Sequence, residues 1–207
     1  MINICVYGAG AIGGYLGCCL SKAGANVSLI ARGPHKEAIE KNGLTLISKT
    51  GSETFHLKVT DNPGELSIQD YIIIAVKAHA ITGIVKNLKP LLKEKTAVIS
   101  AVNGIPWWYF YKANSGTNLE NTHIDSVDPN GLIWDTINPK RAIGCVVYPA
   151  CEIEKPGVIK HIEGNRFSLG EPSEVNSERL KTLSGLLISL SLIHISEPTR
   201  PRLSSYA

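Results

Sequence analysis

The sequence lacks a long apolar run and has no basic segment ahead of its first apolar residues. No stretch reaches the roughly 18 apolar residues that a membrane-spanning helix needs. The longest apolar runs, residues 71–76 and 97–102, have the length of buried strands. The N-terminus, Met1-Ile2-Asn3-Ile4, has no basic segment ahead of its apolar residues, so we expect no secretory signal. These absences predict a cytoplasmic protein with no membrane partner.

Cysteine motifs and charge clusters are also missing. No C-x-x-C pair occurs among the five cysteines, which are Cys5, Cys18, Cys19, Cys145 and Cys151. We therefore expect all five cysteines to be reduced and to pack in the core. The histidines lack the spacing of metal ligands, so no metal site is predicted. The 21 Lys and Arg against 18 Asp and Glu leave a net charge of +3, spread along the chain. A nucleic-acid-binding face would need these charges clustered, so no nucleic-acid partner is expected.

What the sequence does contain is an alternation of apolar strands and helical patterns. The 207 residues are 43% hydrophobic, enough for one full domain and the start of a second. Strands are predicted at residues 2–7, 27–31, 71–76 and 97–102, with helices at 11–23, 34–41 and 78–92 between them. This order predicts an α/β fold, a Rossmann-type doubly wound parallel sheet. Further strands are predicted at 142–148, 157–162 and 166–169, a hairpin at 44–48 and 55–59, and a helix at 178–188.

A glycine-rich loop follows the first strand. The run Gly8-Ala9-Gly10-Ala11-Ile12-Gly13 is G-x-G-x-x-G, placed between a predicted strand and a predicted helix. In this setting Gly8 permits a tight turn, Gly10 lets the backbone approach a pyrophosphate, and Gly13 permits close packing. The helix N-terminus offers unpaired N–H groups to the phosphates. We therefore predict that these six residues bind a dinucleotide.

The end of the second strand favours NADP. An NAD site places Asp or Glu roughly 20 residues beyond the glycine loop, where it accepts from the ribose 2′-hydroxyl. No acid occurs from Ile2 to Lys36, and the strand ends in Ala31-Arg32. A guanidinium suits a 2′-phosphate, so Arg32 is predicted to bind it. The alternative is that Arg32 is a solvated surface charge.

Two polar residues follow neighbouring strands, where ligands bind in open α/β sheets. Lys77 comes after the strand at 71–76, and Asn103 comes after the strand at 97–102. Both are candidates for holding cofactor or substrate. Each also has an ordinary explanation, because Lys is common at strand ends and Asn-Gly is a common turn.

Several motifs together resemble the ketopantoate reductases (2-dehydropantoate 2-reductases). They occur in family order and spacing: Gly8-Ala-Gly-Ala-Ile-Gly-Gly14, Val76-Lys-Ala78, Val102-Asn-Gly-Ile-Pro-Trp-Trp-Tyr-Phe110, Gly144-Cys-Val-Val-Tyr-Pro-Ala150, Pro156-Gly-Val-Ile-Lys-His161 and Asn165-Arg-Phe-Ser-Leu-Gly-Glu171. The resemblance covers residues 1–189. It implies that the loop and Arg32 bind NADPH, that Lys77 and Asn103 line the cofactor and substrate crevice, and that Ala150 makes a backbone contact to the cofactor.

The resemblance also implies what this chain does not carry. The family's general acid is a Lys on a C-terminal helical domain, which also supplies a Glu. Lys181 does not match that Lys in motif, so no catalytic residue is assigned here. The expected organisation is an NADP-binding domain at 1–175 and the start of a truncated helical domain at 176–189. Residues 190–207 resemble the in-frame translation of a transposon-type sequencing adapter. We expect this chain by itself to be inactive.

Three functions remain open from the sequence. The first is NADPH-dependent reduction of 2-dehydropantoate to pantoate, in pantothenate and coenzyme A synthesis. In this case the full-length parent protein carries out the reaction, and a homodimer is one assembly open to that protein. The second is reduction of another branched 2-oxo acid. The third is a non-catalytic NADP-binding sensor module. The predicted partner in the first two is a small-molecule 2-oxo acid.

Overall fold

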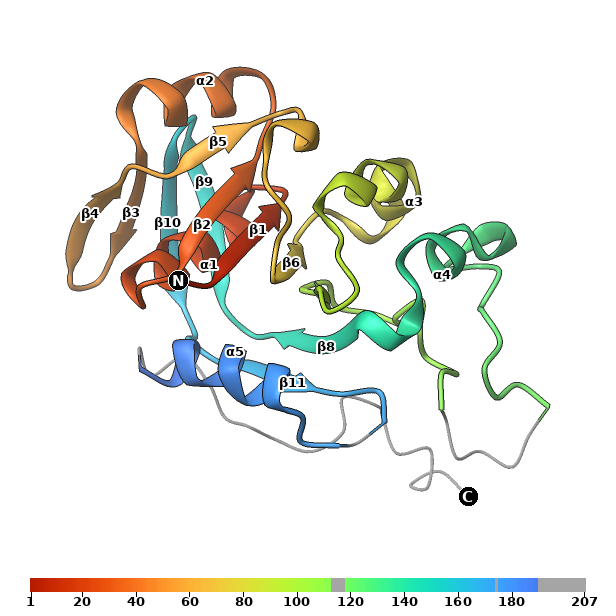
Figure 1. Cartoon of the computed structure of the whole chain (residues 1–207). Helices are drawn as coiled ribbons and strands as arrows, with labels where there is room; N and C mark the ends of the chain where they lie inside the picture. Colours follow the sequence, from red (N-terminus) through yellow and green to blue (C-terminus); the bar gives the residue numbers. More distant parts are fainter. Residues whose placement is uncertain (113–117, 174, 190–207) are drawn as a thin grey trace.

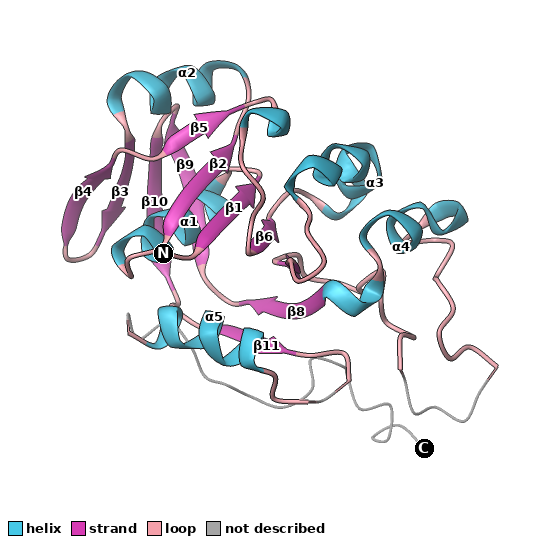
Figure 2. Ribbon diagram, in the orientation of Figure 1, coloured by secondary structure: helices cyan, strands magenta, loops and turns pink. Residues whose placement is uncertain are grey.

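The computed structural model describes residues 1–112, 118–173 and 175–189. The adapter-like stretch 190–207 lies outside the described residues. Figures 1 and 2 show a mixed α/β molecule in which strands of one sheet run through the centre. Among the described residues, no helix has both the length and the apolarity needed to cross a membrane.

The main sheet has seven strands in the order β11-β8-β7-β6-β1-β2-β5. All neighbours pair in parallel except β11, which runs antiparallel to β8. This confirms the predicted Rossmann-type class. The strands are β1 Asn3–Tyr7, β2 Asn26–Ile30, β5 Lys58–Thr60, β6 Tyr71–Ile74, β7 Ala97–Ser100, β8 Ala142–Val147 and β11 Phe167–Gly170.

A second sheet of four strands has the order β4-β3-β10-β9. Its strands are β3 Leu44–Ser48, β4 Gly51–Phe55, β9 Ala150–Lys155 and β10 Val158–Glu163. The predicted hairpin was wrong in its second strand: β4 pairs with β3, whereas residues 58–60 leave this sheet and pair with β2 in the main one. The sequence analysis also missed β9, which pairs with β10 at the edge of the sheet.

In the described parts of the chain, five α-helices connect and cover the strands: α1 Ala11–Lys22, α2 Gly33–Asn42, α3 Ile81–Ile84, α4 Leu132–Ile137 and α5 Glu178–Ile188. The helix predicted over 78–92 is broken, since α3 lies between 3₁₀ turns at Ala78–Ala80 and Val85–Leu91. Pro90 lies inside the second turn, where it cannot donate a helical hydrogen bond. Helix α1 packs against both sheets (Figure 1).

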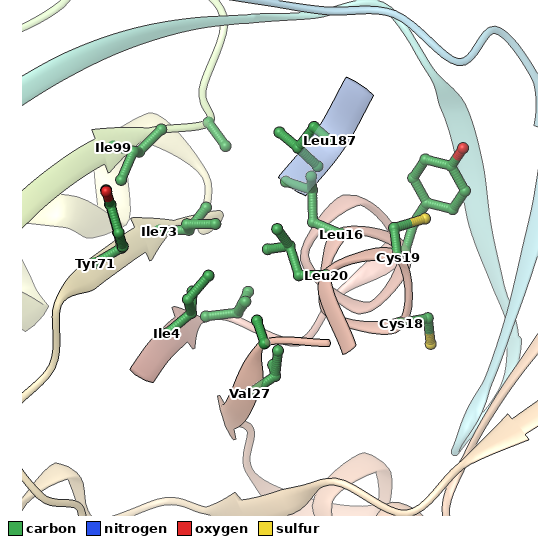
Figure 3. Packing of buried hydrophobic residues seen from close by; sticks show 14 of the residues in the cluster. Ile4, Leu16, Cys18, Cys19, Leu20, Val27, Tyr71, Ile73, Ile99 and Leu187 are labelled. Carbon is green, nitrogen blue, oxygen red and sulfur yellow. The ribbon is translucent and has the colours of Figure 1, made fainter. Parts of the chain in front are cut away.

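The core has two parts because the main sheet is buried on both faces, as parallel sheets are. On one face, α1 and α5 pack together, with Leu187 of α5 lying beside Leu16 and Leu20 of α1 (Figure 3). On the other face, α3 and α4 pack with Trp107 and Trp108, which are 2% and 1% exposed. The strand residues alternate between the two parts, as their period of two requires.

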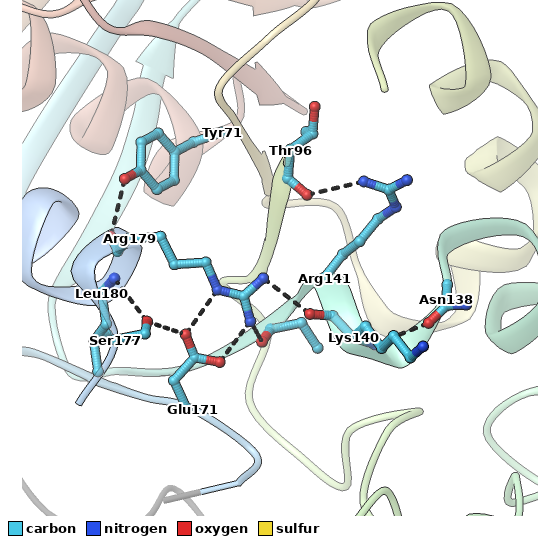
Figure 4. Close-up of polar contacts among 10 residues, drawn as sticks. Tyr71, Thr96, Asn138, Lys140, Arg141, Glu171, Ser177, Arg179 and Leu180 are labelled. Carbon is cyan, nitrogen blue, oxygen red and sulfur yellow. Dashed lines mark hydrogen bonds and ion pairs between the residues drawn. The ribbon is translucent and has the colours of Figure 1, made fainter. Parts of the chain in front are cut away.

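A partly buried ion pair anchors the start of α5. Glu171, which follows β11, accepts from Arg179 Nε at 2.7 Å, and Arg179 also donates to the backbone oxygens of Lys140 and Ala142 (Figure 4). The hydroxyl of Tyr71 on β6 donates to the Arg179 backbone oxygen at 2.9 Å. These contacts hold α5 against the main sheet. The predicted boundary of a separate domain at 175/176 stays a prediction.

Candidate dinucleotide-binding site

A cavity of about 980 Å³ opens at the carboxyl ends of β1, β2 and β6. Five of the residues predicted to bind the cofactor line it together: Gly8, Ala9, Gly10, Arg32 and Lys77. The other walls come from the turns after β6, from the start of α2, and from Ile153 of β9. Open α/β sheets bind ligands at this edge, so the cavity lies where the fold predicts a dinucleotide.

Hydrogen bonds to the end of β2 hold the glycine loop in place. The N–H groups of Gly8 and Ala9 both donate to the Ile30 carbonyl oxygen, at 3.1 and 3.0 Å. Gly8 has φ +102°, a conformation that favours glycine. A Cβ on Gly13 would lie 2.0 Å from the Gly8 carbonyl oxygen. The loop therefore folds tightly onto the first turn of α1.

The loop leaves room for phosphate above Gly10. A Cβ built there meets no heavy atom within 4 Å, so this position faces open space. The first turn of α1, Ala11-Ile12-Gly13-Gly14, carries no acid that would oppose the positive end of the helix. Although Ala11, Ile12 and Gly13 do not line the cavity, their N–H groups belong to the helix N-terminus. These features fit a bound pyrophosphate.

Arg32 lines the cavity at the end of β2. It follows β2 and is exposed, and it forms no ion pair within the described parts of the chain. The structure also brings an acid here, Asp61, which follows β5. Lys36 Nζ lies 3.2 Å from Asp61 Oδ1, and the hydrogen bond from Lys36 holds the pKa of Asp61 below its usual range. Asp61 is therefore charged and paired with Lys36.

Comparison with known proteins identifies the family. The model of the ketopantoate reductase PanE/ApbA family matches residues 4–174. The chain belongs to this family.

Similar proteins extend well beyond the length of this chain. The 2-dehydropantoate 2-reductase of Mesorhizobium japonicum is 46% identical over 92% of this chain and 58% of its own length. A solved structure from Ralstonia solanacearum MolK2, assigned as a ketopantoate reductase, has a TM-score of 0.85 and 36% identity, covering 93% of this chain and 59% of that chain. A D-mandelate dehydrogenase solved with NADH and anilino(oxo)acetate shares the fold, with a TM-score of 0.75 and 21% identity over 95% of this chain and 57% of that chain. The present chain thus spans little more than half of each.

Asn103 and Ala150, to which the family resemblance also gives a role, do not line the large cavity. Asn103 lines a neighbouring cavity of about 160 Å³ with Trp108. Its side-chain amide donates to the Val147 carbonyl oxygen at 2.9 Å and accepts from the Val147 N–H at 3.0 Å. Asn103 therefore links the ends of β7 and β8 in this structure. Ala150 begins β9, and its cofactor contact stays a prediction.

The buried cysteines are poor nucleophiles. Four are buried, and burial raises the pKa of Cys19 to about 11 and that of Cys145 to about 12. A thiol reacts as its thiolate, and these groups stay protonated at neutral pH.

The sequence analysis assigned no role to several residues that line the large cavity, among them His35, Asp61 and Ile153. His35 and Lys36 lie three and four residues after Arg32, so a search for polar side chains near the strand end would have included them. Asp61 and Ile153 come from segments far away in the sequence. Their placement depends on the pairing of β5 with β2 and on the second sheet, which no local pattern showed.

Proposed function

We propose that this chain forms the NADPH-binding half of an enzyme that reduces 2-dehydropantoate to pantoate, in pantothenate and coenzyme A synthesis. Membership of the ketopantoate reductase family supports the reaction, and the 46% identical Mesorhizobium protein bears the name of this activity. The cavity at the strand ends supports a dinucleotide as cofactor. The substrate is a small 2-oxo acid.

The observation that carries the choice of NADPH is the position of Arg32. Its side chain lines the same cavity as the glycine loop, and the nearby Asp61 carboxylate is paired with Lys36. Arg32 thus offers a planar set of donors to a 2′-phosphate, for which guanidinium groups are well suited.

The proposal assigns the chemical step to residues beyond this chain. Reduction of a 2-oxo acid needs a hydride, which the nicotinamide supplies when bound, and a general acid that protonates the new alkoxide. Family resemblance places that acid on a helical domain. Lys181 of α5 is exposed and pairs with Glu178 at 2.7 Å, away from the cavity. The 207-residue chain is therefore proposed to bind NADPH without reducing 2-oxo acids.

Replacing Arg32 tests the cofactor assignment. Arg32→Ala should weaken NADPH binding by about 10- to 100-fold, because a hydrogen-bonded charged contact contributes about 1.5–3 kcal/mol. NADH binding should change little, since NADH has no 2′-phosphate. Both affinities are measured by fluorescence titration of the purified chain. Lys41→Ala is the matched control, because Lys41 is an exposed cation on α2, the helix that follows Arg32, and does not line the cavity. Equal losses for the two cofactors would refute the 2′-phosphate role.

The substrate is tested on a complete protein that carries the helical domain. Steady-state rates with 2-dehydropantoate and with other branched 2-oxo acids should give the highest kcat/KM for 2-dehydropantoate. A higher value for another oxo acid would replace the proposed substrate with that acid. Loss of all activity in a complete protein that still binds NADPH would favour a non-catalytic NADP-binding module.

A further inference from the structure

His35 connects the glycine loop to the second sheet through both of its ring nitrogens. Its Nε2 lies 2.7 Å from the carbonyl oxygen of Ala9, and the N–H of Gly157 donates to its Nδ1 at 3.1 Å. Ala9 belongs to the glycine loop, whereas Gly157 lies in the turn between β9 and β10. His35 itself is on the first turn of α2 and lines the large cavity.

These two partners select one tautomer of the neutral ring. A backbone N–H only donates, so Nδ1 must accept from Gly157 and carries no proton. The proton of the neutral ring is then on Nε2, which donates to the Ala9 oxygen. An imidazolium would direct a second N–H against the Gly157 N–H and lose that contact. One tautomer of the neutral ring satisfies both neighbours.

The contact to Ala9 controls the direction of the next N–H. The Ala9 carbonyl and the Gly10 N–H share one planar peptide group, so fixing the oxygen fixes the N–H. The Ala9 N–H is already held by the Ile30 carbonyl oxygen on the other side. The loop is thereby fixed between β2 and α2, and the Gly10 position faces open space.

The contact to Gly157 holds the turn that follows β9, the strand whose Ile153 lines the cavity. Gly157 has φ +78°, and a Cβ there would lie 3.0 Å from Ala38 Cβ on α2. Its carbonyl oxygen accepts from the Thr45 N–H at 2.9 Å. The turn therefore packs closely on α2 and ends the strand that carries Ile153 into the cavity.

We propose that His35 is a positioning residue for the dinucleotide, acting through the Ala9 carbonyl to hold the Gly10 N–H in its phosphate-binding direction. The inference rests on the proposed function, because it requires a dinucleotide in this cavity. It adds a residue outside the G-x-G-x-x-G motif to the phosphate-binding unit.

Two variants separate the two contacts. In His35→Gln, the side-chain nitrogen lies as many bonds from Cα as Nε2 does, so it can still donate to the Ala9 oxygen. In His35→Asn, the side-chain oxygen takes the place of Nδ1, so it can still accept from Gly157. Each variant keeps one hydrogen bond, so both should lose similar thermal stability. Stability alone therefore does not separate them.

The measurements are NADPH affinity and amide exchange of the full 207-residue chain. His35→Gln should bind NADPH within about twofold of the parent chain, and His35→Asn should bind roughly fivefold or more weakly, as expected for one lost hydrogen bond. In the cofactor-free chain, exchange at the Gly8 and Ala9 amides should be faster in His35→Asn and unchanged in His35→Gln.

Equal NADPH affinities and equal exchange rates in the two variants would overturn the inference. A parent chain that binds no NADPH would instead overturn the proposed function. Amide exchange needs no cofactor, so it still shows whether His35 holds the glycine loop. The two failures are thus distinguishable.

Discussion

At the scale of single residues, Asp70 ties the start of β1 to the segment before β7. Its Oδ1 lies 2.6 Å from Lys93 Nζ, and its Oδ2 accepts from the Asn3 N–H at 2.9 Å. The hydrogen bond from Lys93, with a smaller contribution from Asn3, holds the pKa of Asp70 below its usual range. The ionised carboxylate therefore stabilises the folded chain.

Asp70→Asn should remove a stabilisation that depends on pH. Because the folded pKa lies below the unfolded value of about 3.9, the contribution is complete above about pH 4 and is lost as the pH falls through the folded pKa. Urea unfolding should thus show a larger deficit for the variant at pH 7 than at pH 3. Asp135→Asn, at an exposed position of α4, is the control and should have little effect. A deficit of equal size at both pH values would contradict the role of the charge.

The candidate site could be predicted from the sequence only where a local motif or the end of an apolar strand marks its residues. Gly8 and Gly10 belong to a motif of fixed spacing, and Arg32 follows a strand that apolar residues reveal. Asp61 has no such signal, because its place in the cavity depends on β5 pairing with β2. The sequence predicted that Asn103 follows a strand, but it did not predict the contacts of the Asn103 side chain. These contacts are hydrogen bonds to the backbone of β8.

At the scale of elements, glycines serve two different purposes in the unit formed by β1, the glycine loop and α1. Gly13 is required by the fold, since a Cβ there would overlap the Gly8 carbonyl oxygen at 2.0 Å. Gly10 has φ −67°, which any residue adopts, and space around its Cβ position. Packing therefore does not explain a glycine at this position, whereas the proposed pyrophosphate contact does.

Two alanine variants test this separation. Gly10→Ala should change the free energy of unfolding by about 1 kcal/mol or less, because Ala is a weaker N-cap than Gly, yet it should abolish NADPH binding. Gly13→Ala should destabilise the chain by more than about 1 kcal/mol, because the backbone must shift to relieve the overlap. Urea unfolding and NADPH titration measure the two effects. NADPH binding by Gly10→Ala at parental affinity would place the pyrophosphate elsewhere.

Elements with a strong apolar pattern were predicted within a few residues, and those without one were not. Residues 71–74 are wholly apolar, so β6 was clear. Residues 150–155 are Ala-Cys-Glu-Ile-Glu-Lys, largely exposed at a sheet edge, so β9 had little apolar signal. The hairpin was misassigned because alternation along 55–59 shows a strand but not the partner with which it pairs.

At the scale of the whole molecule, the main sheet needs cover on both faces. Helices α3 and α4 with the paired tryptophans cover one face, and α1 with α5 covers much of the other. Leu180, Leu183 and Leu187 of α5 are 5%, 1% and 2% exposed and belong to the same apolar cluster as the strands. In this structure α5 thus contributes to the core on one face of the main sheet.

Substitutions in α5 test whether this helix belongs to that core. Leu183→Ala should lower the free energy of unfolding by about 2–5 kcal/mol, because it leaves a cavity beneath α5. Ile188→Ala, in the same helix but 47% exposed, should cost less than about 1 kcal/mol. Both are measured by urea unfolding, and NADPH affinity of the folded Leu183 variant should be unchanged because α5 does not line the large cavity. Equal, small losses for the two variants would mean that the domain is stable without α5, and the predicted boundary at 175/176 would then gain support.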